Sequence, residues 1–367
     1  MIHFAPDLLR STIAFLVVLG VLVFIHEFGH YLAARWCGVF VEAFSIGFGQ
    51  ALATWRDRLG TQWKLAWVPL GGYVKLHGQE RPEEVAPAVR ATWIPGRTFQ
   101  EKSVGSRAII VAAGPIANFV LAIVLFSGLF ATVGRPVLIP VVSQVEPESS
   151  AAHAGIKPGD RIEAVDGHPI PTFSVLQGYI APHPGEHLVL RIKRGNEKIS
   201  LPVVIGSRRQ NGQTIGLLGV ESGQVTYQHL SVPAAIAAGF TETWRVTAET
   251  AHGVAQIFTA GRGASDIGGP LRIAQLSGQV AALGAASFVS FIAILSVNLG
   301  LINLLPIPIL DGGHLLFFLF EALRGRPLPP RAREYGFRAG LALLAGLFVF
   351  ATWNDLLHLG LSHWFAG

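Results

Sequence analysis

Two histidines and a glutamate in the stretch His26–His30, which reads His-Glu-Phe-Gly-His, have the spacing of a metal site. In a helix, residues four apart share one face and lie about 6 Å apart along the axis, so His26 and His30 can bind one ion. This spacing is typical of zinc, and Glu27 is placed to take a proton from a metal-bound water and pass it to a leaving amine. The stretch predicts a zinc hydrolase.

A five-residue match of this kind also arises by chance, so its surroundings matter. Here it lies near the end of an otherwise uncharged apolar run, Ser11–Ala34. Ionisable side chains are costly in lipid, and those found there are functional candidates by default, which favours the metal site. The run is long enough to span a bilayer, lacks a basic start and continues into the motif, so we expect a retained span and not a cleaved signal peptide.

The composition predicts a membrane protein. Of the 367 residues, 51% are hydrophobic and 14% are charged, and the mean hydropathy is +0.47, which is too apolar for an ordinary soluble protein. Four runs are long enough to cross a bilayer, and we predict a polytopic α-helical membrane protein with about four transmembrane helices. The runs are Ser11–Ala34, Ala108–Gly134, Ala285–Leu310 and Ala339–Asn354.

The distribution of charge predicts the orientation. The chain carries a net charge of +5, and its Lys and Arg gather between the first two runs and between the last two. Such clusters mark cytoplasmic loops, so we expect a lipid bilayer as the partner and not nucleic acid. Both termini and the long segment between the second and third runs then lie in the periplasm, in a bacterial inner membrane. The single cysteine, Cys37, excludes an internal disulfide and a cysteine-based zinc site.

The first cytoplasmic loop, within a membrane region covering residues 1–134, predicts a membrane-associated β-hairpin. Two extended runs, Phe44–Trp55 and Thr61–Val68, flank a polar turn. Gly72 and Tyr73 follow, in a stretch where glycine allows close backbone approach and tyrosine favours an extended chain. This edge either pairs with an unfolded substrate by strand addition or belongs to a hairpin that only packs under the helices.

Residues 135–222 have the composition of a soluble α+β domain. Leu188, Leu190 and Ile192 alternate with polar residues, as in a half-buried strand. The stretch Ala154–Ile162 leads through a tight turn, and this run resembles a bacterial PDZ domain. PDZ domains bind extended peptides along a strand edge, so this inserted domain is expected either to bind peptide or to act as a lid. Residues 223–284 predict periplasmic amphipathic helices, and residues 285–367 the last two spans.

A catalytic zinc site needs a third protein ligand, and Asp311 is the candidate. It ends an uncharged run in which Pro306 and Pro308 prevent continuous helical hydrogen bonding. Within a membrane, such a break is tolerated only where the backbone is buried in protein or lines a cavity. His314 is a weaker alternative ligand, and Asp311 is also able to cap the following helix. In the second span, Asn118 is read mainly as a packing residue, with a place near the site as the alternative.

Together these motifs resemble the site-two protease family of intramembrane zinc metalloproteases, in particular its branch acting on anti-sigma factors. The matching elements are His26–His30, Gly71–Lys75, Gly114–Asn118, the PDZ-like run and Ser296–Gly313. The resemblance implies that His26, His30 and Asp311 bind Zn²⁺, that Glu27 is the general base, and that Asn298 and Asn303 lie near substrate backbone. It implies single-span substrates such as anti-sigma factors and signal peptide remnants. The chain departs from well-known members of that branch, which carry two PDZ domains.

The sequence therefore predicts an intramembrane zinc metalloendopeptidase. The rival hypothesis is a membrane-tethered PDZ adaptor with a structural or inactive metal site. Glu27 argues against the adaptor, because a structural site needs no base and is normally closed by a fourth protein ligand. A zinc hydrolase acting on something other than protein is disfavoured by the PDZ-like run.

Overall fold

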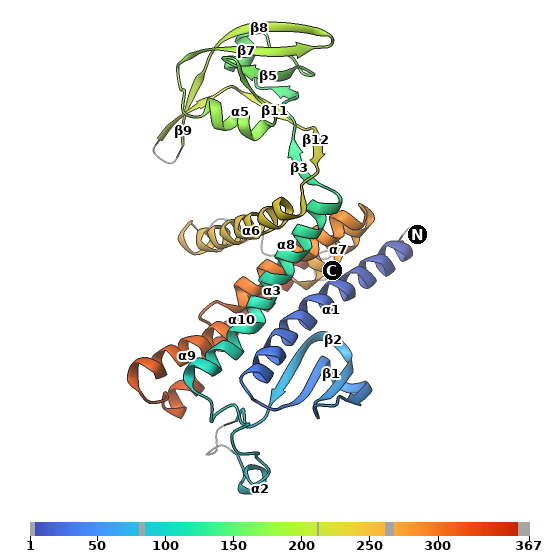
Figure 1. Cartoon of the computed structure of the whole chain (residues 1–367), viewed down its shortest axis with the longest axis vertical. Coiled ribbons are helices and arrows are strands. Elements are labelled where there is room, and N and C mark those ends of the chain that lie inside the picture. Colours follow the sequence, from blue (N-terminus) through green and yellow to red (C-terminus); the bar gives the residue numbers. More distant parts are fainter. Residues whose placement is uncertain (1–3, 81–84, 211–212, 261–267, 359–367) are drawn as a thin grey trace, which may run out of the picture. The chain divides into compact units, whose positions relative to one another are not determined.

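The computed structural model describes residues 4–80, 85–210, 213–260 and 268–358. The chain divides into two compact units, coloured along the sequence in Figure 1. The helical unit comprises Met1–Leu129 and Val232–Gly367, and the inserted unit comprises Phe130–Ser231. The first holds the metal motif and the second holds the PDZ-like run.

Four helices in the described ranges are long and apolar enough to cross a bilayer, in agreement with the predicted number. Helices suit this role because all their backbone hydrogen bonds are internal, and lipid offers no other partners. They are α1 (Phe4–Trp36), α3 (Val104–Thr132), α8 (Ala285–Asn303) and α10 (Pro330–His358).

Helices α1, α3 and α8 pack together around a small apolar core. Val18 and Leu22 of α1 meet Ile292 of α8, with partly buried leucines of α3 beside them. Nearer the metal motif the backbones of α1 and α3 come closer still, because a Cβ added at Gly29 would lie 2.3 Å from the carbonyl oxygen of Ala113. Small residues allow such close approach in membranes. The motif on α1 therefore lies directly against α3.

The third predicted span is shorter than expected. Helix α8 ends at Asn303 and not at Leu310, because Pro306 and Pro308 cannot continue its hydrogen bonding. A non-helical segment leads to α9 (Asp311–Arg324), whose N-cap position is Leu310. The sequence interpretation of Asp311 as an N-cap is therefore wrong: Asp311 is the first helical residue, so its side chain is not used to cap the helix.

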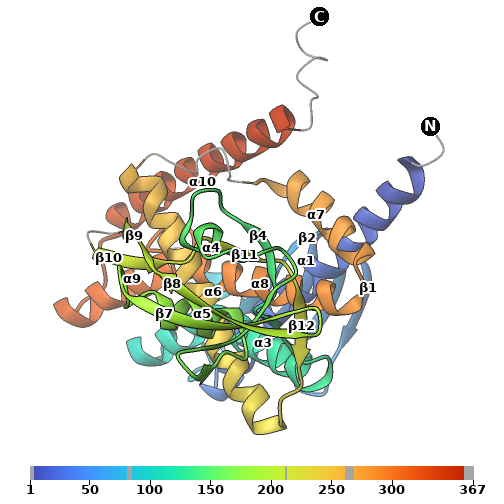
Figure 2. The same cartoon turned by 90° about the horizontal axis from the view of Figure 1, so that it is seen from above.

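The last span begins earlier than predicted, at Pro330, and its far end is fixed to a short helix, α7 (Pro270–Ala282). The buried carboxylate of Asp355 accepts hydrogen bonds from the backbone N–H groups of Gly269, Leu271 and Arg272 at 2.8, 3.1 and 3.1 Å. Helix α7 in turn lies along α1, as Figures 1 and 2 show. Before it comes α6 (Val232–Ala260), in the region predicted to be helical.

The predicted hairpin is present and longer than expected. Strand β1 (Val41–Arg56) pairs antiparallel with β2 (Gln62–Leu76), and the stretch Gly71–Lys75, predicted to follow the hairpin, lies inside β2. Several register shifts bend the pair. The part of the hairpin near α1 is buried, where the ring of Phe44 lies 5.9 Å from that of Tyr31. The hairpin thus packs against the helices, and its association with a membrane stays a prediction.

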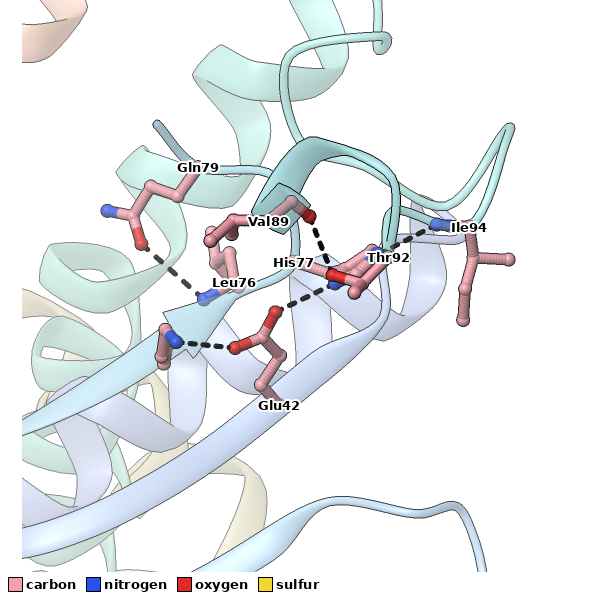
Figure 3. Close-up of polar contacts among 8 residues, drawn as sticks. Glu42, Leu76, His77, Gln79, Val89, Thr92 and Ile94 are labelled. Atoms are coloured by element: carbon pink, nitrogen blue, oxygen red, sulfur yellow. Dashed lines mark hydrogen bonds and ion pairs between the residues drawn. The ribbon is translucent and has the colours of Figure 1, made fainter. Parts of the chain in front are cut away.

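A buried histidine fixes the end of β2 to the loop that follows (Figure 3). The His77 Nδ1–H donates to Glu42 Oε1 at 2.7 Å, and the Ile94 N–H donates to His77 Nε2 at 2.9 Å. Burial alone raises the pKa of Glu42, but Lys75 and His77 hold this pKa below its usual value. The segment from 80 to 102 was predicted to be a loose loop; residues 81–84 lie outside the described residues, and the part from 85 to 102 is anchored here and contains one helical turn, α2 (Pro87–Arg90).

The inserted unit is a small α+β fold whose main sheet has the strand order β6-β5-β7-β8. Leu188, Leu190 and Ile192 on β7 face its core, as the alternating pattern predicts. The last strand, β12, lies beyond the predicted boundary at residue 222 and pairs with β3, the first. The elements are β3 (Arg135–Leu138), β4 (Val142–Val145), α4 (Ser150–His153), β5 (Arg161–Val165), β6 (His168–Pro169), α5 (Phe173–Ile180), β7 (His187–Arg194), β8 (Glu197–Val204), β9 (Gly206–Gln210), β10 (Gln213–Leu217), β11 (Val220–Ser222) and β12 (Val225–Gln228).

An ion pair joins the tight turn of this unit to its sheet. The side chain of Asp160 is 1% exposed and accepts hydrogen bonds from Arg194 Nε and from the Lys157 backbone N–H, both at 2.8 Å. Burial alone raises the pKa of Asp160, but these donors hold it below its usual value. Since the folded-state pKa is lowered, the pair stabilises the unit at neutral pH, and that contribution is lost as the pH falls through the folded-state pKa.

Replacing Arg194 with alanine is expected to destabilise the inserted unit at pH 7 by clearly more than a surface substitution does, because it removes the cation that is hydrogen-bonded to the 1% exposed side chain of Asp160. The difference from wild type should shrink as the pH falls below the usual range of an aspartate and through the lowered folded-state pKa of Asp160. Amide hydrogen exchange over β5 and β7 of the full-length protein measures the effect. Arg191→Ala, on the exposed face of the same strand, is the control and should change stability by less than about 0.5 kcal/mol. An equal loss in both variants would contradict the role of the pair.

Candidate metal centre

Three donor atoms converge where the end of α1 meets the start of α9. His26 Nε2 lies 3.2 Å from Asp311 Oδ2, His30 Nε2 lies 3.5 Å from it, and the two nitrogens are 3.3 Å apart. Tetrahedral zinc ligands about 2.0–2.1 Å from the metal lie about 3.3 Å from one another. The three separations therefore match donors arranged around one zinc ion.

The chemistry of these atoms also fits a cation. Asp311 Oδ2 is buried and has no hydrogen-bond partner among the described residues, and the atoms beside it are the two imidazole nitrogens at 3.2 and 3.5 Å. A buried carboxylate oxygen without a partner is costly, and a cation between the three atoms removes that cost. Two imidazoles and a carboxylate form a donor set that zinc takes in catalytic sites. His314 lines the same cavity but is not part of this three-residue group.

A cavity of about 520 Å³ opens beside the three donors, and it contains most of the other predicted site residues. Glu27, Gly72, Tyr73 and Asn303 all line it. Strand β2 approaches Glu27 closely, because a Cβ added at Gly72 would lie 3.2 Å from Glu27 Cγ. The cavity thus brings a carboxylate, a strand and an amide side chain close to the three donor atoms.

Asn298 is the predicted site residue that lies elsewhere. It is not among the residues lining the cavity, and its Oδ1 accepts a hydrogen bond from Thr250 Oγ1 of α6 at 2.9 Å. This contact joins α8 to α6. The predicted contact of Asn298 with substrate stays a prediction, and the structure gives the side chain a different partner.

Sequence reasoning underestimated the part that α3 plays at the site. The Asn118 amide lies 3.2 Å from His26 Nδ1, and the Ile110 carbonyl oxygen lies 2.9 Å from His30 Nδ1. Between them, Gly114 leaves room for the His30 ring, since an added Cβ would lie 2.2 Å from its Nε2. The sequence did contain a signal for this role: the three positions are four residues apart, so they lie on one face of α3.

Helix α9, which carries Asp311, is tied to α3 by an ion pair. Arg107 of α3 donates from both terminal nitrogens to Glu321 of α9, at 2.7 and 3.4 Å, and its guanidinium lies 5.1 Å from the centre of the Phe318 ring. Both charged side chains are largely buried. Bidentate geometry fixes direction as well as distance, so the pair holds α9 in place beside α3.

Comparison with known proteins places this arrangement in a family. The model of peptidase family M50 matches residues 14–347, which include both the histidine motif and Asp311. The chain belongs to peptidase family M50. This M50 peptidase is a multi-pass membrane protein and a metalloprotease, and its metal is Zn²⁺.

Named relatives agree with the family. A protein of Rhizobium meliloti, whose name describes it as a zinc metalloprotease, is 45% identical over 370 residues, covering 95% of this chain and 97% of its own. A protein of Agrobacterium fabrum with the same description is 42% identical and covers 94% and 95%. The regulator of sigma-E protease RseP of Escherichia coli is 32% identical over 447 aligned residues, covering 94% and 98%.

Solved structures match a smaller part of this M50 peptidase. One is the PDZ domain of an SdrC-like protein from Listeria monocytogenes, 19% identical with a TM-score of 0.20, covering 22% of this chain and 84% of that one. Another is the corresponding domain from Listeria innocua, 20% identical with a TM-score of 0.21, covering 25% and 99%.

Proposed function

We propose that this M50 peptidase cleaves the membrane-spanning segments of single-span proteins, with His26, His30 and Asp311 as the zinc ligands and Glu27 as the general base. The observation that carries the proposal is the convergence of three donor atoms, one of them a buried carboxylate oxygen without a hydrogen-bond partner, beside a cavity that Glu27 lines. When bound, zinc supplies Lewis-acid polarisation of the scissile carbonyl.

The residues of the chain then have separate tasks. Glu27 takes the proton from the attacking water and delivers it to the leaving amine, as a positioned carboxylate does in general acid–base catalysis. Arg107 and Glu321 hold α9, and so Asp311, at the correct distance from the histidines.

Strand β2 supports the proposed mode of substrate binding. A substrate helix has to unwind first, because its carbonyl groups are hydrogen-bonded within the helix. Among the described strands β2 pairs only with β1, so the part of β2 that lines the cavity at Gly72 and Tyr73 has no second strand beside it. An unwound segment adds to such an edge through backbone hydrogen bonds, and Asn303 is placed to bind a further peptide group.

We also propose the orientation that the charge pattern predicts. The basic loops face the cytoplasm, the termini and the inserted unit face the periplasm of the inner membrane, and exposed apolar side chains of the hairpin, including Trp55 and Trp67, face lipid. The inserted unit has a cavity of about 220 Å³ between α5 and residues 215–220, which suits an extended peptide. Substrates of the anti-sigma factor type, and signal peptide remnants, fit this arrangement.

The test uses the full-length protein in detergent and a tagged single-span reporter whose outer domain has been removed. We expect cleavage by the zinc-loaded protein, loss of cleavage after the metal is removed with a chelator, and recovery when zinc is returned. Cleavage that persists without metal would contradict the proposal. Binding of several reporters without turnover, with zinc present, would instead support the adaptor hypothesis.

A further inference from the structure

One face of α3 contacts both metal-motif histidines on the side of each ring that points away from Asp311. His26 and His30 direct Nε2 toward Asp311, so each Nδ1 faces α3. The Ile110 carbonyl and the Asn118 side chain lie at these two Nδ1 atoms. The two positions are eight residues apart, about two helical turns, so one helix reaches both rings.

The His30 contact has only one possible direction. A backbone carbonyl accepts and cannot donate, so His30 Nδ1 carries the proton and donates to the Ile110 oxygen at 2.9 Å. A neutral imidazole with its proton on Nδ1 has a free lone pair on Nε2. Since Nε2 faces His26 and Asp311, the Ile110 contact leaves His30 ready to bind a cation.

The same requirement, a free lone pair on Nε2, applies to His26. For His26 Nε2 to bind a cation beside Asp311, its Nδ1 has to carry the proton and needs an acceptor. The side chain facing it is the amide of Asn118, which is 0% exposed and has both an acceptor and a donor end. In the structure, the Nδ2 end lies 3.2 Å from His26 Nδ1, and the buried Oδ1 has no hydrogen-bond partner among the described residues. The two ends are assigned and not observed, and turning the amide by 180° exchanges them, so that the oxygen faces His26 Nδ1.

We propose that Asn118 is a positioning residue: its Oδ1 accepts the hydrogen bond of His26 Nδ1–H and so holds His26 in the tautomer that binds metal through Nε2. This inference rests on the proposed role of His26 as a ligand. Asn118 lies inside α3, so the hydrogen bonds of the helix fix its backbone, and its carbonyl oxygen also accepts a separate hydrogen bond from Ser296 Oγ of α8 at 2.8 Å. Partners of this kind orient ligand histidines, and their loss typically lowers metal affinity 10–100-fold.

Three variants, with a fourth in reserve, distinguish a positioning role of Asn118 from a packing role. Asn118→Leu keeps the approximate volume and removes the acceptor, whereas Asn118→Asp keeps an acceptor oxygen at the same place. Ser296→Ala is the matched control, since it removes the neighbouring hydrogen bond to the Asn118 backbone but leaves the His26 contact intact. Asn118→Ala is the second acceptor-free variant if the leucine protein does not fold.

The measurement is zinc affinity of the full-length protein in detergent, by competition with a chelator, together with the visible absorption spectrum after Co²⁺ replaces zinc. We expect Asn118→Leu to bind zinc 10–100-fold more weakly and to change the Co²⁺ spectrum. Asn118→Asp should restore affinity to within about threefold of wild type, and Ser296→Ala should stay within the same range.

Two results would overturn the proposal. One is equal zinc affinity in Asn118→Leu and wild type, and the other is an Asn118→Asp variant that binds as weakly as Asn118→Leu, since packing alone would then explain the loss. A wild-type protein that binds no zinc would instead refute the ligand assignment on which the proposal rests. The wild-type measurement therefore distinguishes the two failures.

Discussion

Replacing Glu27 with glutamine should lower the rate of peptide-bond cleavage by about 10²–10⁴-fold while zinc stays bound, because a positioned general base contributes a factor of this size. Glutamine has nearly the same shape as glutamate but cannot take up a proton at neutral pH. Glu27 lines the cavity and does not belong to the group of three donor atoms, so its loss should leave the metal-binding atoms in place.

The measurement compares cleavage of the single-span reporter with the zinc content of each sample. Glu249→Gln, an exposed glutamate on α6, is the control for a change from glutamate to glutamine elsewhere, and it should cleave at the wild-type rate. Full activity of Glu27→Gln would refute the general-base assignment. Loss of both activity and zinc would show that Glu27 acts on the metal-binding atoms instead.

Replacing Asp311 with alanine should lower zinc affinity by more than about 100-fold, since loss of a direct ligand exceeds the 10–100-fold effect of losing an outer partner. Asp311 supplies the one carboxylate of the three-residue group, and its Oδ2 lies 3.2 and 3.5 Å from the two histidine nitrogens. Without it, two imidazoles are left to hold the ion.

His314→Ala is the matched comparison for this variant. His314 lies one turn further along α9 and lines the same cavity, but it stands outside the three-residue group. Competition with a chelator should show near wild-type zinc affinity for His314→Ala and weak binding for Asp311→Ala. The reverse pattern would assign the third ligand to His314.

The histidine motif and Asp311 were accessible from sequence because each carries its own signal. His26 and His30 share a helix face by spacing alone, and Asp311 is a carboxylate at the end of a long uncharged run. The structure brings the three together within 4.8 Å. A local pattern was enough here, since the site needs few residues and each is rare in an apolar segment.

The contacts of Asn118 and Asn298 were not accessible in the same way. Helices α3 and α8 are apolar on nearly all sides, so their sequences do not indicate which face meets a neighbouring helix. Asn118 faces His26, whereas Asn298 faces Thr250 of α6. An asparagine in such a span predicts an inward-facing amide but not its partner, because the rotation of the helix about its axis is fixed by tertiary packing.

Segment ends were missed for a different physical reason. The apolar run up to Leu310 continues past the end of α8, because the proline-containing segment after Asn303 is also apolar, and hydropathy does not distinguish a buried loop from a helix. The hairpin was underestimated because its strands change register several times, which breaks the alternation by which strands are recognised.

The pairing of β3 with β12 has an evolutionary consequence. These are the first and last strands of the inserted unit, with Arg135 opposite Gln228, so the chain leaves α3 and returns to α6 at neighbouring points. A domain whose two ends are adjacent can be gained, lost or duplicated without separating the helices it interrupts.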